Sequence, residues 1–226
     1  MIGNFDKLSV ERKAEMWKAI RGSIWLFFGF VIVTQQVLTK GYLYQFDQWV
    51  RHLKRHTFKG TSSHLLLAVD DLGLRGFTAT VLLISAALIG YRFKSWRPLN
   101  LSILSLLLLN GVVGIAKLSF GRVKPRLADK LFQASGMSYP SGHAANALLT
   151  WGLLAYLIFR YTNRKPFVGM RLDPVVALIT LGVCTASLLR NTHWFSDLLG
   201  GLLLGGSLLV LVIAVDRAIH SEKQPS

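Results

Sequence analysis

Six apolar stretches, each close to the length of a membrane span, constrain the fold of this chain more than any other feature. A helix needs about 20 mostly apolar residues to cross the hydrocarbon core of a bilayer. Hydrophobic residues make up 52% of the 226-residue chain and charged residues 16%, which is too apolar for an ordinary soluble domain. We therefore predict an all-α fold, a polytopic membrane protein built as a six-transmembrane-helix bundle. The stretches are Ile24–Leu38, Leu74–Tyr91, Leu99–Ala116, Ala144–Phe159, Pro174–Leu189 and Leu198–Val215.

The segments around these spans suggest a simple organisation. Residues 1–23 form a polar leader without a small-residue cleavage site, so the first span is predicted to be an uncleaved anchor. Part of the leader, 8–20, reads either as a helix lying on the membrane interface or as a frayed basic tail. Residues 24–216 are predicted to form the six-helix domain, with 39–73 as an interfacial loop and 217–226 as a tail.

The charge of the chain narrows the possible partners. A net charge of +15 suits a protein that works against anionic lipid headgroups, where each nearby cation is worth about 1 kcal/mol. The basic residues are spread over loops on both sides of the membrane, which argues against nucleic acid as a partner. Lys and Arg in short loops are biased toward the cytoplasm. Raw counts are nearly balanced, but several basic residues on the second side belong to the motifs below and its first loop is long, so we predict cytoplasmic N- and C-termini.

Span parity brings the polar motifs together without any assumption about orientation. Consecutive spans alternate in direction, so the ends of the third and fifth and the starts of the fourth and sixth open on the same face. The basic segment 117–126 leaves the third span, Ser141-Gly142-His143 opens the fourth, and His193 and Asp197 precede the sixth. All of these segments are therefore expected at one vestibule.

Each motif taken alone has an ordinary structural explanation. The basic segment 117–126 is typical of side chains that snorkel to a membrane interface. Ser141 is a plausible N-cap, and a helix start of this kind attracts anions. His193 stands four residues before Asp197, so the carboxylate can lie near the imidazole, fix its tautomer and stabilise its cation.

Together the motifs indicate chemistry, because ionisable groups at membrane depth are costly and gather at functional sites. Two histidines, a carboxylate and several cations are the groups that metal-free phosphoryl transfer needs. Cations neutralise phosphate oxygens, one histidine attacks phosphorus and the other protonates the departing oxygen. The sequence shows no acidic cluster suited to a two-metal site, and the lone Cys184 permits no disulfide framework or thiolate metal site. We therefore predict no metal and no cofactor.

The spaced motifs resemble those of the type 2 phosphatidic acid phosphatase superfamily of lipid phosphate phosphatases, which includes bacterial undecaprenyl pyrophosphate phosphatases. The family's first motif is Lys, six residues, Arg-Pro; Lys117 and Pro125 match it, with Lys124 in place of the arginine. The second, Pro-Ser-Gly-His, matches residues 140–143 in full. The third is Ser-Arg, five residues, His, three residues, Asp. His193 and Asp197 match it, whereas 186–187 reads Ala-Ser.

The resemblance implies a role for each matching residue. His193 would be the nucleophile that forms a phosphohistidine, and Asp197 would orient it. His143 would protonate the leaving group and then activate water. The residues implied to hold the phosphate are Lys117, Lys124, Ser141 and Gly142.

The main departure from the family pattern is Ser187, which stands where a bidentate arginine is usual. Lysine and serine cannot imitate that ligand. Arg190 follows three residues later, close to one helical turn, and we take it as the candidate replacement. Arg122 and Arg126 are further candidates, for which interfacial snorkelling is the favoured interpretation.

The sequence therefore predicts an integral membrane lipid phosphatase of the cell membrane, acting on a phosphomonoester or pyrophosphate with its site on the extracytoplasmic face. Substrates left open are polyprenyl pyrophosphate, phosphatidylglycerophosphate and phosphatidic acid. Alternatives are a lipid phosphotransferase with the same site and a catalytically weak relative that binds lipid phosphate, which the absent Ser-Arg pair would suit. A vanadium-dependent haloperoxidase on the same motifs is disfavoured by the six spans. The sequence gives no oligomeric state.

Overall fold

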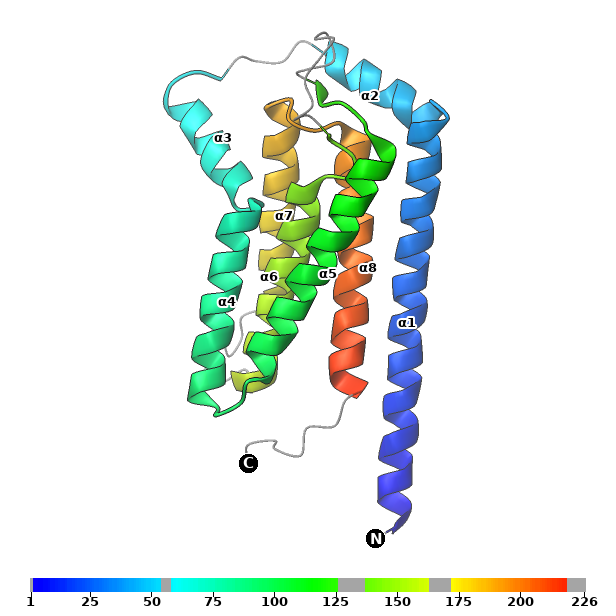
Figure 1. Ribbon diagram of the computed structural model, residues 1–226, viewed down its shortest axis with the longest axis vertical. Coiled ribbons are helices and arrows are strands. Elements are labelled where there is room, and N and C mark those ends of the chain that lie inside the picture. The colour runs from blue at the N-terminus through cyan, green and yellow to red at the C-terminus, as the bar shows by residue number, and fades with distance from the viewer. Residues whose placement is uncertain (1, 54–57, 126–136, 163–171, 219–226) are drawn as a thin grey trace.

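The computed structural model describes residues 2–53, 58–125, 137–162 and 172–218, without the side chains of 2–13 and 162. These residues form eight helices arranged mostly side by side (Figure 1). The helices are α1 (Ile2–Leu38), α2 (Tyr42–His52), α3 (Thr61–Asp71), α4 (Arg75–Arg92), α5 (Arg97–Phe120), α6 (Gly142–Thr162), α7 (Leu172–Leu189) and α8 (Phe195–Ala218).

The predicted membrane bundle is confirmed, with one adjustment to the second span. Within the described ranges, five helices are long and apolar enough to cross a membrane: α5, α6, α7, α8 and the part of α1 from Ala14 to Leu38. Helices α3 and α4 meet this criterion only as a pair, bent by 54° at a short break. Gly73 lies at the break, where a Cβ atom would come within 2.8 Å of the His143 carbonyl oxygen. The second span is thus a bent pair of helices, packed against the start of α6, and it brings the number of candidate spans in the described ranges to six.

Helix α1 differs from both interpretations of the leader. It runs without interruption from Ile2 to Leu38, so the leader continues the helix of the first span. It is neither a separate helix lying across the interface nor an unstructured tail. The predicted interfacial loop 39–73 also contains regular structure, since it holds α2 and α3.

The four helix ends expected on one face do lie at one end of the bundle. Helices α5 and α7 finish where α6 and α8 begin, with α2 across the same end (Figure 1). We call this the active-site end. The start of α1 and the end of α8 lie at the opposite end. There Asp216 of α8 is buried and forms ion pairs with Arg97 of α5 and Arg160 of α6, which joins three helices far from the motifs.

Glycines allow α8 to pack closely on α6, as the small residues of this span predict. A Cβ atom at Gly201 would lie 2.4 Å from the Ser141 carbonyl oxygen. One at Gly205 would lie 2.8 Å from the carbonyl oxygen of Ala145. Only residues without a side chain allow the two backbones to approach this closely. The contact fixes the first turn of α8, which carries Asp197, against the first turn of α6, which carries His143.

Candidate active site

Two residues in the left-handed conformation end the helices that lead into the site. Gly121 has a φ of 58° and donates its N–H to the Lys117 carbonyl at the end of α5. Asn191 has a φ of 53° just after α7. Such residues commonly terminate helices, and Gly and Asn tolerate the conformation best. The two reversals direct residues 122–125 and 192–194 across the starts of the neighbouring helices.

The predicted N-cap at Ser141 is confirmed. Its hydroxyl accepts a hydrogen bond from the Ala144 N–H at 3.3 Å, and its own N–H donates to the Asp197 carbonyl at 2.9 Å. Lys117 reaches the same helix start from α5, because a Cβ atom at Gly142 would lie 3.9 Å from the Lys117 Nζ. The Lys117 ammonium also donates to the Met137 carbonyl at 3.3 Å. A cation thus lies beside a helix N-terminus, where backbone dipoles already favour an anion.

The two histidines of the separate motifs face each other across this region. The ring centroids of His143 and His193 are 5.8 Å apart, with the ring planes inclined by 58°. His193 is 3% exposed, whereas His143 is half-buried. Fifty residues separate the two in the chain, and the packing of α6 on α8 brings them together. Two imidazoles at this distance can act on opposite sides of one phosphorus atom.

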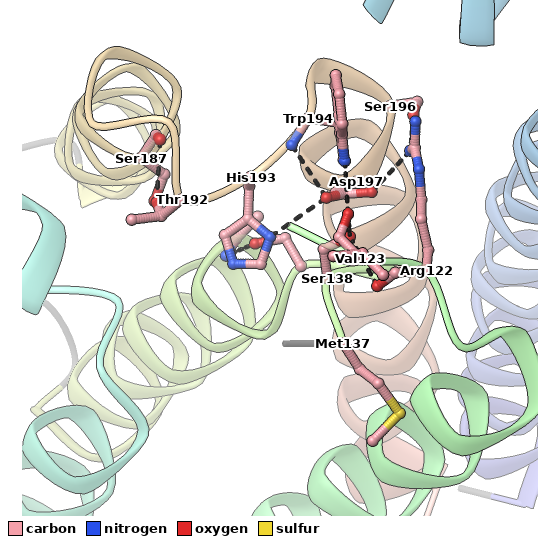
Figure 2. A network of polar contacts seen from close by, with 12 residues as sticks. Arg122, Val123, Met137, Ser138, Ser187, Thr192, His193, Trp194, Ser196 and Asp197 are labelled. Carbon is pink, nitrogen blue, oxygen red and sulfur yellow. Dashed lines mark hydrogen bonds and ion pairs between the residues drawn. The ribbon is translucent and has the colours of Figure 1, made fainter. Parts of the chain in front are cut away.

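The Asp197 carboxylate caps the start of α8 and also lies beside His193. Its Oδ2 accepts the Trp194 N–H at 3.0 Å, which caps the helix, and lies 3.4 Å from His193 Nδ1 (Figure 2). The carboxylate is fully buried. His193 Nδ1 makes no hydrogen bond within the described part of the chain. The carboxylate therefore faces the Nδ1 side of the ring, as the four-residue spacing predicts, and leaves Nε2 for other partners.

Arg122 corrects the snorkelling interpretation. Only 10% of its side chain is exposed, and its guanidinium donates to Asp197 Oδ1 at 2.8 Å and to Asp47 Oδ2 at 2.7 Å. It also donates to Ser196 Oγ at 2.6 Å and lies over the Trp194 ring at 5.0 Å. Sequence reasoning did not single out Asp47 as a site residue. The arginine is directed into the protein because two buried carboxylates there bind it more favourably than the interface would.

Arg190 lies beside the position where the family arginine is absent. Its guanidinium donates to Asp70 of α3, and the Ser187 hydroxyl donates to the other oxygen of the same carboxylate. Ser187 and Asp70 are buried, while 29% of the Arg190 side chain is exposed. Asp70, like Asp47, was not predicted from the sequence as a site residue. One guanidinium N–H group is engaged with Asp70, and the planar group carries four more.

The remaining predicted cations divide between described and undescribed parts of the chain. The charge of Lys124 acts on both Lys117 and His143, which places it near them. Asp70 and Lys117 also act electrostatically on His143. Arg126 lies outside the described residues. The site thus gathers Lys117, Lys124, Ser141, Gly142, His143, His193 and Asp197, with Arg190 on the α3 side.

Tyr139 anchors the loop before α6. It is fully buried, its ring stacks on Phe30 of α1, and its hydroxyl bonds with the Thr34 hydroxyl at 2.7 Å. Burial raises the pKa of the Tyr139 phenol to about 12, so it stays neutral in this contact. The anchor holds the segment 137–141 between α1, α5 and α8.

Among the described residues, no group of three or more His, Cys, Asp or Glu side chains is arranged to hold a metal ion.

An all-helical membrane bundle with two facing histidines, a buried carboxylate and cations at a helix N-terminus defines the class of the protein, and comparisons with known proteins agree. The model of the PAP2 superfamily matches residues 98–220, and the chain belongs to this superfamily. All the motif residues of α5 to α8 lie in the matched segment.

Two curated relatives are lipid phosphatases by name. Phosphatidylglycerophosphatase B of Bacillus subtilis is 28% identical over 167 residues, which cover 72% of this chain and 79% of the relative. Lipid A 1-phosphatase of Porphyromonas gingivalis is 30% identical over 153 residues, which cover 66% of this chain but only 29% of that protein. The crystal structure of a transmembrane PAP2-type phosphatidylglycerolphosphate phosphatase from Bacillus subtilis matches 89% of this chain and 98% of its own. Its TM-score is 0.79 at 22% identity, which shows the shared fold.

Proposed function

We propose that this protein is a membrane lipid phosphatase that hydrolyses a lipid phosphomonoester or pyrophosphate through a phosphohistidine, without a metal ion. The observation that carries the proposal is the pair of facing imidazoles, 5.8 Å apart, at a helix start that also holds the Lys117 ammonium. Relatives named as lipid phosphatases support the same class of substrate.

In the first step His193 attacks phosphorus through Nε2. Asp197 faces Nδ1 at 3.4 Å, so it favours the tautomer with hydrogen on Nδ1 and stabilises the positive charge that develops on the ring. A bond forms between Nε2 and phosphorus while the bond from phosphorus to the lipid oxygen breaks. His143 gives its proton to that oxygen, which leaves as the lipid alcohol or lipid monophosphate.

In the second step the neutral His143 takes a proton from water, and the resulting hydroxide oxygen attacks the phosphohistidine. The nitrogen–phosphorus bond breaks, inorganic phosphate leaves, and His193 returns to its starting form. Equatorial phosphate oxygens would be held by Lys117, Lys124 and Arg190, with backbone N–H groups of the Ser141–Gly142 turn. Replacement of water by a second lipid alcohol would make the same site a phosphotransferase.

The site lies at the end of the bundle opposite the start of α1, and we propose that this end faces away from the cytoplasm in the cell membrane. The basic residues described at the other end, Arg92, Lys94, Arg97 and Arg160, agree with the positive-inside rule. The substrate would then reach the site laterally from the outer leaflet.

Release of phosphate by the purified protein tests the proposal directly. The panel contains phosphatidylglycerophosphate, phosphatidic acid, an undecaprenyl pyrophosphate and a lipid A 1-phosphate, each assayed with and without a chelator. His193→Ala is the control that removes the nucleophile. We expect release from at least one lipid, abolished by His193→Ala and unaffected by the chelator. Equal release by the variant refutes the phosphatase proposal, and loss on chelation refutes the metal-free mechanism.

A further inference from the structure

Helix α2 is connected to the catalytic carboxylate by a buried polar network. Asp47 of α2 is 1% exposed, although α2 is a short amphipathic helix rich in exposed aromatic side chains. Its Oδ1 accepts the Ser196 N–H at 2.9 Å and its Oδ2 accepts the Ser196 hydroxyl at 2.5 Å. A carboxylate at membrane depth is costly unless its hydrogen bonds are satisfied, and here they are.

Arg122 extends this network from Asp47 to Asp197. The two nitrogens of its guanidinium fork divide their bonds. Nη2 donates to Asp47. Nη1 donates to both Ser196 and Asp197, which lie beside Arg122 in Figure 2. The Trp194 indole, which lies under this guanidinium, donates to the Val123 carbonyl at 2.8 Å and fixes the loop that carries Arg122. Each member is held by at least two others, so none can turn without breaking several bonds.

The network determines which oxygen of Asp197 faces His193. Because Arg122 occupies Oδ1 and the Trp194 N–H occupies Oδ2, the carboxylate plane is fixed from both sides. Only the Oδ2 side lies near His193 Nδ1. Without Arg122 only the Trp194 N–H would hold the carboxylate, and without Asp47 the guanidinium would lose its second carboxylate partner. Asp47 and Arg122 can hold the Asp197 carboxylate in this way without contacting the phosphate themselves.

We propose that Asp47 is a positioning residue for the proposed phosphatase reaction, acting through Arg122 to hold Asp197 against His193. Helix α2 is thereby part of the catalytic machinery and more than an aromatic belt at the membrane surface. The inference rests on the proposed function, because it assigns Asp47 a role only if His193 is the attacking group.

Asp47→Asn tests this inference, with Asp216→Asn as the matched control. Both residues are buried acids bound to arginine, but Asp216 lies at the opposite end of the bundle. For Asp47→Asn we expect kcat per folded molecule to fall about tenfold to a hundredfold with KM unchanged, as for other residues that orient a reacting group. Asp216→Asn is expected to lower the melting temperature and leave kcat unchanged. A kcat for Asp47→Asn equal to that of the unchanged protein overturns the inference.

A double-mutant cycle with Arg122→Lys tests whether Asp47 acts through the arginine. Lysine keeps the charge but cannot bridge two carboxylates and a hydroxyl, so Arg122→Lys alone should lower kcat. Asp47→Asn should then cost little further in that background, since residues in one network are not additive. The same fold-loss in both backgrounds contradicts the proposed route.

A second, milder variant covers the case in which Asp47→Asn fails to fold. Ser196→Ala removes the hydroxyl shared by Asp47 and Arg122 and keeps every charge, so kcat should fall about threefold to tenfold with KM unchanged. An unchanged kcat for this variant also counts against the inference. Failure of the unchanged protein to release phosphate from any lipid would instead refute the proposed function, and this inference with it.

Discussion

Arg190 forms an ion pair with Asp70, and the Ser187 hydroxyl binds the second oxygen of the same carboxylate. Three residues from α3 and the end of α7 are thus joined at the position where the family pattern has an arginine. Asp70 holds the Arg190 guanidinium through Nη1, so the side chain has less conformational freedom to lose when it binds phosphate. The geometry supports Arg190 as the proposed substitute for the absent arginine.

Arg190→Ala should therefore lower kcat/KM by about a hundredfold, similar to the loss of one oxyanion donor elsewhere. Arg190→Lys should recover little of it, because an ammonium cannot reproduce the guanidinium fork. Lys117→Ala, measured in the same lipid assay, gives the reference for a lost phosphate ligand. Full turnover by Arg190→Ala alongside an inactive Lys117→Ala would show that Arg190 does not replace the missing residue.

Asp70→Asn is expected to produce a smaller loss of kcat/KM than Arg190→Ala, because the arginine stays but is held less firmly. Asp71→Asn is the matched control, since the neighbouring carboxylate forms none of these bonds among the described residues. The comparison uses the assay above with folded protein monitored by gel filtration. Equal effects of the two substitutions would mean that Asp70 has no specific part in holding Arg190.

Substitutions of the two histidines should differ in how the loss of activity depends on the basicity of the leaving group. General-acid catalysis contributes about 10²–10⁴-fold when the departing oxygen is basic. His143→Ala should lose that factor on a lipid phosphate and much less in the first step on an aryl phosphate, whose phenolate leaves without a proton. With the aryl phosphate we expect a burst of one phenol per enzyme, because the variant also lacks the base that activates water.

His193→Ala is the control for this experiment and should give no burst with either substrate. Rapid-quench measurement of phenol and of acid-labile phosphate on the protein reports both steps. A burst that persists in His193→Ala would contradict the role of His193 as the nucleophile. A loss of the same size on both substrates in His143→Ala would contradict the role of His143 as the general acid.

Much of this architecture could be predicted from the sequence because its signals are local or periodic. Span length gave the bundle, alternation of direction put His143 and His193 on one face, and the Ser141 cap follows from the residue type before an apolar run. Each of these depends on residue type, span length or span order, which a single sequence displays directly.

The network around the histidines could not be predicted in the same way. Asp47 and Asp70 lie 75 and 120 positions from the arginines that they bind, and nothing in a single sequence reports which pairs meet. The sequence contains a partial indication that these carboxylates are paired. The chain has only 11 acidic residues, and an acidic side chain next to an apolar span is costly unless it has a partner. The predicted snorkelling of Arg122 is wrong because an arginine reaches for the interface only when no buried carboxylate competes for it.

Close packing of α8 on α6 should be sensitive to a single methyl group. At Gly205 a Cβ atom would lie 2.8 Å from the carbonyl oxygen and 2.9 Å from the Cα of Ala145, both backbone atoms that cannot move alone. Gly205→Ala is therefore expected to destabilise the protein by about 1–3 kcal/mol, the usual cost of overpacking. Gly111→Ala of α5 is the control, because nothing lies within 4 Å of its added Cβ. Thermal unfolding in detergent should separate the two, and equal melting temperatures would contradict the close contact.

The proposed orientation can be tested with little background, because Cys184 is the chain's one cysteine and is buried. Tyr42 at the start of α2 is 85% exposed at the active-site end, and Trp96 before α5 is 76% exposed at the other end. In intact cells a membrane-impermeant maleimide should label Tyr42→Cys but not Trp96→Cys. Permeabilised cells should give labelling of both, which controls for reactivity. Labelling of Trp96→Cys alone in intact cells would invert the topology and place the active-site end at the cytoplasmic surface.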